Sequence, residues 1–102
     1  MICLGTELKF NVHVKQIGDI HMSDYDFECD FFVFERRKVN IRKSDMKKVD
    51  DDNYLAMIAT EQAVKMGKGR ICMELTAYIP DEDFPDGMRT EKTRVCTDIV
   101  IA

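Results

Sequence analysis

Polar and apolar residues alternate along three long segments of the chain. Residues 7–14, 25–34 and 70–79 each place apolar side chains at every second position. Successive side chains of a strand point to opposite faces, so this spacing predicts strands with one buried face. The predicted inward residues are Leu8, Phe10, Val12 and Val14, then Tyr25, Phe27, Cys29, Phe31 and Val33, then Ile71, Met73, Leu75, Ala77 and Ile79. In the third segment Glu74 and Thr76 are predicted to face outward.

Shorter segments complete the pattern. Residues 39–43, 54–60 and 90–101 read as further strands, and the apolar set of the last is Val95, Ile99 and Ile101. The run 50–53 and the Gly67-Lys68-Gly69 stretch are predicted turns, and Thr60 is a candidate cap for a helix of at most two turns. Many short strands with almost no helix are typical of sandwiches. We therefore expect one domain over residues 1–102, an all-β, immunoglobulin-like antiparallel β-sandwich of six to seven strands.

Three phenylalanines depart from the alternation and are the predicted partner-binding residues. Phe32 and Phe34 interrupt the otherwise polar face of the second long segment. Phe84 stands among acidic residues in a loop that Pro80 and Pro85 stiffen, and a stiff loop presents an aromatic anchor at low entropic cost. The alternative is that loops of the same chain cover these rings, with Phe84 plugging the end of the sandwich.

Composition and charge narrow the classes of partner. A hydrophobic fraction of 45% and a charged fraction of 33% are those of a globular protein. The net charge of -4 argues against nucleic acid, and we read the basic stretch 35–43 as a solvated strand surface. No run of about 18 apolar residues is present, and the first residues lack the features of a signal peptide, so no membrane partner is expected.

Candidate catalytic and metal-binding residues are few. His13 and His21 are expected on the surface, where no third group orients them, so no catalytic residue is predicted and the chain is not expected to be an enzyme. A hydrolase using the acidic loops 50–53 and 81–86 is a remote alternative. These loops lack the spacing of an EF-hand, and Gly67-Lys68-Gly69 precedes a strand instead of a helix. No metal and no cofactor are therefore expected.

The four cysteines, Cys3, Cys29, Cys72 and Cys96, occur singly, which fits neither a zinc site nor a disulfide framework. Strand parity directs Cys29 to the core, Cys72 to the opposite face of its strand and Cys96 away from Val95. Because the parities of Cys29 and Cys72 disagree, we expect four reduced thiols, with a disulfide as the alternative.

Four motifs resemble those of small proteins from Bacteroides-type bacteria and their phages and prophages: Met22-Ser-Asp-Tyr-Asp-Phe27, Lys43-Ser-Asp45, Gly67-Lys-Gly69 and Ile79-Pro-Asp-Glu-Asp-Phe-Pro-Asp-Gly87. The architecture is also similar to the immunoglobulin-like N-terminal domain of phage baseplate upper proteins. This resemblance implies a structural module of a tail, baseplate or head-fibre attachment, made in the bacterial cytoplasm and located in the virion. Its partners would be other phage structural proteins or further copies of itself. A monomeric β domain that binds a peptide or glycan is the alternative.

Overall fold

The computed structural model describes residues 1–13 and 21–102, so the predicted strand residue Val14 lies outside the described part. The elements, in chain order, are β1 (Leu8–His13), the 3-10 turn η1 (Met22–Asp24), β2 (Asp26–Phe32), β3 (Val39–Arg42), the 3-10 turn η2 (Lys43–Asp45), β4 (Lys47–Asp50), β5 (Asn53–Ile58), α1 (Thr60–Met66), β6 (Gly69–Pro80) and β7 (Met88–Ile101). No helix in these two ranges is long and apolar enough to span a membrane.

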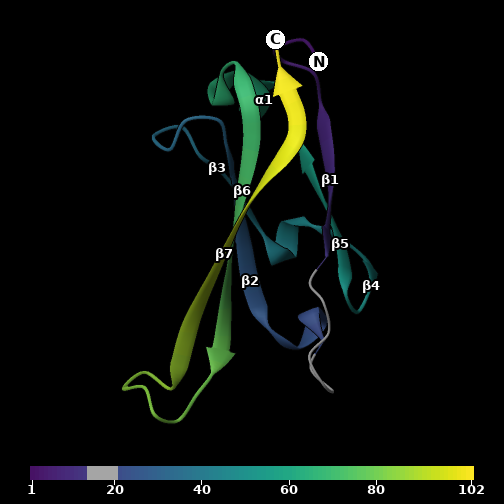
Figure 1. The fold of residues 1–102 in the computed structure, drawn as a ribbon. Helices are drawn as coiled ribbons and strands as arrows, with labels where there is room; N and C mark the ends of the chain where they lie inside the picture. The colour runs from purple at the N-terminus through teal and green to yellow at the C-terminus, as the bar shows by residue number, and fades with distance from the viewer. Residues whose placement is uncertain (14–20) are drawn as a thin grey trace.

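The strands form two antiparallel sheets, one with the order β1-β5-β4 and one with the order β3-β2-β6-β7. The two sheets face each other (Figure 1). This confirms the expected all-β sandwich and gives it seven strands. In constant-type immunoglobulin domains the second strand lies beside the first and fifth. Here β2 instead lies between β3 and β6, so the resemblance holds for the layered architecture and the strand order is different.

The core lies between the sheets and is built by the predicted alternation. Phe10 of β1 stacks on Phe31 of β2 with ring centroids 4.8 Å apart, and Phe27 meets the Tyr54 ring edge to face at 5.2 Å. Aromatic pairs at these distances contribute packing energy beyond their buried area. Further fully buried side chains include Val12, Cys29, Ile58, Met66 and Ile71.

The strands β6 and β7 form a long hairpin that extends beyond the other strands (Figure 1). The pairing is uniform from Pro80, opposite Met88, to Cys72, opposite Cys96. Between Arg70 and Cys72 the register shifts, and the Thr97 hydroxyl fills this bulge by donating a hydrogen bond to the Ile71 carbonyl at 2.8 Å. At the far end of β7 the N-terminal segment pairs with it, through a bridge between Ile2 and Ile101.

Three local predictions need correction. The strand β4 was not predicted, because all four of its residues are exposed and show no alternation. The helix has seven residues, within the expected limit of two turns, but its cap is Ala59, whose amide donates to the Gln62 side chain, and Thr60 is the first helical residue. The basic stretch 35–43 is only partly strand, since β3 begins at Val39.

The prediction for Val95 is wrong, whereas the outward orientation predicted for Glu74 and Thr76 is confirmed. Val95 is 51% exposed, because β7 is the edge strand and its cross-strand neighbour Met73 is itself only partly buried. Glu74 and Thr76 lie on the outer face of the four-stranded sheet, as parity requires, yet both are buried. Neighbouring side chains on that face cover Glu74, as the ion pairs described below show.

Candidate functional site

The tip of the β6–β7 hairpin, residues 81–87, is a compact turn with an aromatic side chain at its apex. Three backbone hydrogen bonds close it: Asp81 donates to the Gly87 carbonyl at 2.9 Å, Gly87 to the Phe84 carbonyl at 2.9 Å, and Phe84 to the Asp81 carbonyl at 3.3 Å. Gly87 adopts a positive φ of 73°, which glycine reaches without steric cost. The tip is therefore ordered by hydrogen bonds within its own backbone.

Phe84 is 43% exposed at this apex, so it does not plug the end of the sandwich. The exposed carboxylates beside it belong to Glu82, Asp83 and Asp86. Asp81 is compensated by Arg89 at 3.2 Å, and Arg89 also pairs with Glu91 at 3.0 Å. The hairpin tip thus presents one aromatic ring inside a group of acidic side chains.

Phe34 is also exposed, but it lies at the opposite end of the same hairpin. It is 52% exposed and lies against Gly67, at the end of α1. The twelve residues of β6 separate that end from the tip by about 36 Å, at roughly 3.3 Å per residue. The structure therefore does not bring Phe34 and Phe84 into one contact surface.

Phe32 is covered by the chain itself, which corrects its assignment as a ring buried only on assembly. It is 3% exposed and lies on the outer face of the four-stranded sheet. Lys38 and Arg94 cover the ring, with their charged groups 5.4 Å and 5.0 Å from its centroid. A cation over an aromatic face is attractive, so the alternative of cover by the same chain holds for Phe32.

Around Phe32 the charged side chains form one network. Arg94 donates to Glu74 through two nitrogens, at 2.8 Å and 3.2 Å, and also to Glu35. Lys92 adds a second cation at 3.6 Å from Glu74. The hydrogen bond from Arg94 holds the pKa of Glu74 below its usual value, although burial acts the other way. The same guanidinium lowers the pKa of Glu35. Arg94 and Lys92 of β7 are thereby held over the outer face of the sheet.

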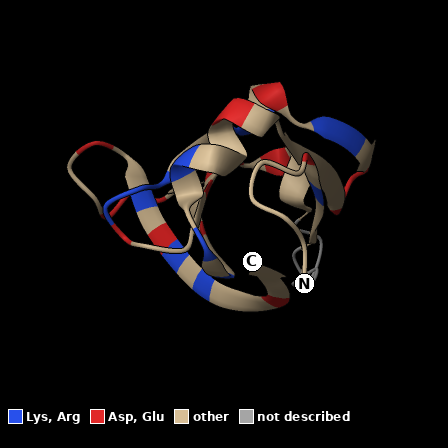
Figure 2. Ribbon diagram, turned by 90° about the horizontal axis from the view of Figure 1, so that it is seen from above, with Lys and Arg blue, Asp and Glu red and all other residues tan. Residues whose placement is uncertain are grey.

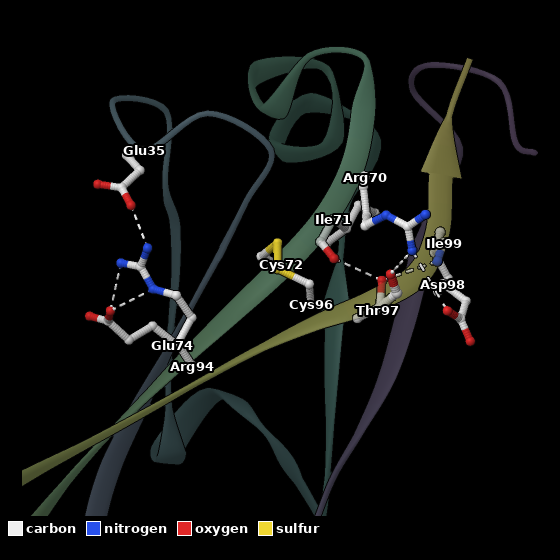
Figure 3. The surroundings of a disulfide bond; sticks show 10 residues. All are labelled: Glu35, Arg70, Ile71, Cys72, Glu74, Arg94, Cys96, Thr97, Asp98 and Ile99. Carbon is white, nitrogen blue, oxygen red and sulfur yellow. Dashed lines mark hydrogen bonds and ion pairs between the residues drawn. A yellow bond between two sulfur atoms is a disulfide. The ribbon is translucent and has the colours of Figure 1, made fainter.

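The cysteines differ most from the sequence expectation. Cys72 and Cys96 are joined in a disulfide across β6 and β7, with Cα atoms 4.0 Å apart (Figure 3). The expectation of four reduced thiols is therefore wrong, because both residues face outward and the hairpin register places them opposite each other. Cys3 is free and exposed. Cys29 is free and buried, and this burial raises its thiol pKa to about 12.

The signal for this pair was present in the hairpin. Pro80 opposes Met88, and counting eight residues back from one and eight forward from the other reaches Cys72 and Cys96. The sequence argument compared Cys72 with Cys29 instead, and so it missed the pairing.

Both histidines lie near the turn that joins β4 to β5 in the three-stranded sheet. His13 is exposed and lies 2.9 Å from the Asn53 side-chain oxygen. His21 is half-buried and lies 3.1 Å from Asp52, whose hydrogen bond raises the pKa of the imidazole. Among the described residues no group of three or more His, Cys, Asp or Glu side chains is arranged to hold a metal ion.

A groove of about 670 Å³ opens where the chain crosses from β3 to β4. Tyr54 and Tyr78 line it together with both acidic and basic side chains. Lys43 also lines it, and its ammonium donates to the Ser23 and Tyr25 carbonyls at 2.9 Å and 2.5 Å. This volume lies within the usual range for small-molecule sites.

Searches of known protein families, of curated proteins and of solved structures found no match to this chain.

Proposed function

We propose that this chain is a non-enzymatic assembly module that binds other protein chains through the tip of its β6–β7 hairpin. Following the sequence resemblance, we place it in a phage or prophage particle, in the tail, the baseplate or a head-fibre attachment. Its partners are other structural proteins of the particle or further copies of the chain. It is made in the bacterial cytoplasm and incorporated into the virion.

The observation that carries the proposal is the exposed Phe84 on a turn ordered by its own backbone. Burial of a large aromatic side chain is a common source of binding energy at interfaces. Because the three backbone hydrogen bonds already fix the turn, little conformational entropy is lost when a partner covers it. The surrounding acids favour a partner with an apolar pocket rimmed by basic side chains.

The charge pattern elsewhere supports a localised contact. Basic and acidic positions are interspersed around the ribbon (Figure 2). The tip differs, because Glu82, Asp83 and Asp86 lack a basic side chain among their immediate chain neighbours. Charge complementarity therefore discriminates between partners more strongly at the tip than along the rest of the hairpin.

The test compares Phe84→Ala with Phe34→Ala, a second exposed phenylalanine far from the tip. Each variant is tagged, expressed during particle production and assayed for co-purification with intact particles, and each is also followed by light scattering in isolation. We expect both variants to unfold within a few degrees of the wild type, and only Phe84→Ala to lose association. A wild-type chain that stays monomeric and never co-purifies with particles would contradict the assembly role.

The groove beside Lys43 supports a second candidate, a monomeric domain that binds a peptide or glycan. Two tyrosines with mixed charges around them are the kind of lining that fixes a polar ligand. Chemical-shift perturbation by a panel of short peptides and oligosaccharides tests it, with Tyr78→Ala as the variant. Saturable shifts at the groove, lost in that variant, would favour this candidate over the assembly module.

A further inference from the structure

The disulfide lies in a row of three residues that crosses the four-stranded sheet. Phe32 of β2 is opposite Cys72 of β6, and Cys72 is opposite Cys96 of β7. All three lie on the outer face. Phe31 and Ile71, which directly precede Phe32 and Cys72 in the chain, point the other way and are part of the core. The sulfur atoms therefore bridge from the middle of the sheet to its edge (Figure 3).

The two sulfur atoms differ in their surroundings. Beyond Cys96 the sheet ends, since β7 is its edge strand, and residues 90–96 are all exposed. Beyond Cys72 stands the Phe32 ring, which is 3% exposed and held under Lys38 and Arg94. One side of the disulfide is open to solvent and the other is closed by an aromatic side chain.

This asymmetry matters because thiol–disulfide exchange is directional. A thiolate attacks one sulfur in line with the sulfur–sulfur bond, on the side opposite the sulfur that leaves, and access is one of the factors that set its rate. Attack on Cys96 proceeds from the free edge of β7. Attack on Cys72 comes from the side of β2, where the strand register places Phe32 opposite it.

We propose that Cys72–Cys96 is a thiol–disulfide exchange site, attacked at the Cys96 sulfur by small thiols and dithiol reductants, with Phe32 directing the attack. The attacking thiolate forms a mixed disulfide with Cys96, and the bond between the two protein sulfurs breaks, so that Cys72 leaves as a thiolate. The second thiol of a dithiol then displaces Cys96. In sum, the protein disulfide gains two electrons and two protons, and the dithiol is oxidised to its own disulfide.

The remaining thiols give an internal contrast. Cys29 is completely buried, and its raised pKa leaves almost no thiolate near neutral pH. Cys3 is exposed and unpaired, so it reports the reactivity of an unhindered thiol. Exchange at the disulfide can therefore be distinguished from background reactions within the same chain.

The experiment treats the native wild-type chain with reduced glutathione, quenches early with acid and maps the modified peptides by mass spectrometry. We expect glutathione on Cys96 to exceed that on Cys72 several-fold. Phe32→Ala should raise the share on Cys72, while Phe34→Ala, which alters an exposed ring outside the row, should leave the distribution unchanged. Phe32→Leu serves as the second variant if Phe32→Ala does not fold.

Three results would overturn the proposal. The first is an equal distribution of glutathione, or a preference for Cys72, in the wild type. Another is exchange only in denaturant. The last is a folded Phe32 variant with the wild-type distribution, which would show that the ring does not direct the attack.

Discussion

At the scale of single residues, Glu74 is a buried carboxylate on the outer face of the four-stranded sheet, the face on which Phe32 and Thr76 are also covered. Its partner Arg94 also pairs with Glu35 and covers the Phe32 ring, so one guanidinium joins two carboxylates and an aromatic side chain. Buried charges persist when they are paired and hydrogen-bonded. Glu74 satisfies this condition through Arg94 and Lys92, which explains why an outward-facing carboxylate is tolerated in a buried position.

This arrangement predicts a pH-dependent effect of Glu74→Gln. The pKa of Glu74 is lower in the folded chain than in the unfolded chain, so its ion pairs stabilise the fold fully above the unfolded value of about 4.3. That stability is lost as the pH falls through the lower, folded value. The difference in Tm between wild type and variant should therefore be large at pH 7 and shrink at acid pH.

Thermal unfolding by circular dichroism from pH 7 down to pH 3 measures this difference. Glu82→Gln is the matched control, because Glu82 is exposed at the hairpin tip and its substitution should leave Tm nearly unchanged at every pH. A Tm difference for Glu74→Gln that stays constant across the range would mean that the ion pairs contribute nothing.

The thiols provide a second prediction at this scale. The chain purified in air and denatured without reductant should show two reactive thiols, those of Cys3 and Cys29, and four after reduction. In the native chain Cys29 should react on the order of a thousandfold more slowly than Cys3, because its raised pKa suppresses the thiolate. Titration with an aromatic disulfide reagent gives both numbers, and four thiols without reductant would restore the expectation from sequence.

At the scale of elements, alternation predicted those strands that bury one face and failed where burial is absent. The strands β1, β2 and β6 were found because their inward residues contact the core. By contrast, β4 pairs with β5 through its backbone while all four of its side chains are exposed, so its sequence carries no periodic signal. The exposure of single aromatic residues is harder still to predict, since the buried Phe32 and the exposed Phe34 stand only two positions apart.

Gly69 begins β6 and lies close to the segment that connects β2 to β3. A Cβ at this position would lie 2.6 Å from the Val33 side chain, and its φ of 137° is unfavourable for other residues. We expect Gly69→Ala to lower the free energy of unfolding by about 2 kcal/mol or more. Gly87→Ala, where the added atom meets open space, should cost only about 1 kcal/mol for its backbone conformation.

Chemical denaturation of both variants, repeated in a Val33→Ala background, separates the two causes. The smaller side chain should recover part of the loss at Gly69 and none of the loss at Gly87, which is the coupling that a double-mutant cycle isolates. Equal losses for the two glycine variants would contradict a steric role for Val33.

At the scale of the whole molecule, the hairpin unites the features that distinguish this sandwich. Its two strands supply the edge of the larger sheet, the exposed aromatic tip, the charge network over Phe32 and the disulfide. The remaining strands supply most of the core between the sheets. Alternation thus predicts the core, including the inward residues of β6, whereas the disulfide and the charge network of the hairpin depend on pairing between strands.

The disulfide is also expected to contribute to global stability. It joins residues 24 positions apart, and closing a loop of that length in the unfolded chain corresponds to about 3.5 kcal/mol of conformational entropy in the chain-entropy treatment. For a domain of 102 residues this is a substantial part of a stability that is commonly about 5–15 kcal/mol.

The double variant Cys72→Ser with Cys96→Ser should therefore unfold at clearly lower denaturant concentration than the wild type. Cys3→Ser is the control, because Cys3 is exposed and unpaired, and it should not shift the midpoint. Chemical denaturation of all three chains with and without reductant tests the idea: reductant should move the wild type toward the double variant and leave that variant unchanged. If the oxidised wild type and the double variant share one midpoint, the hairpin register holds without the covalent link.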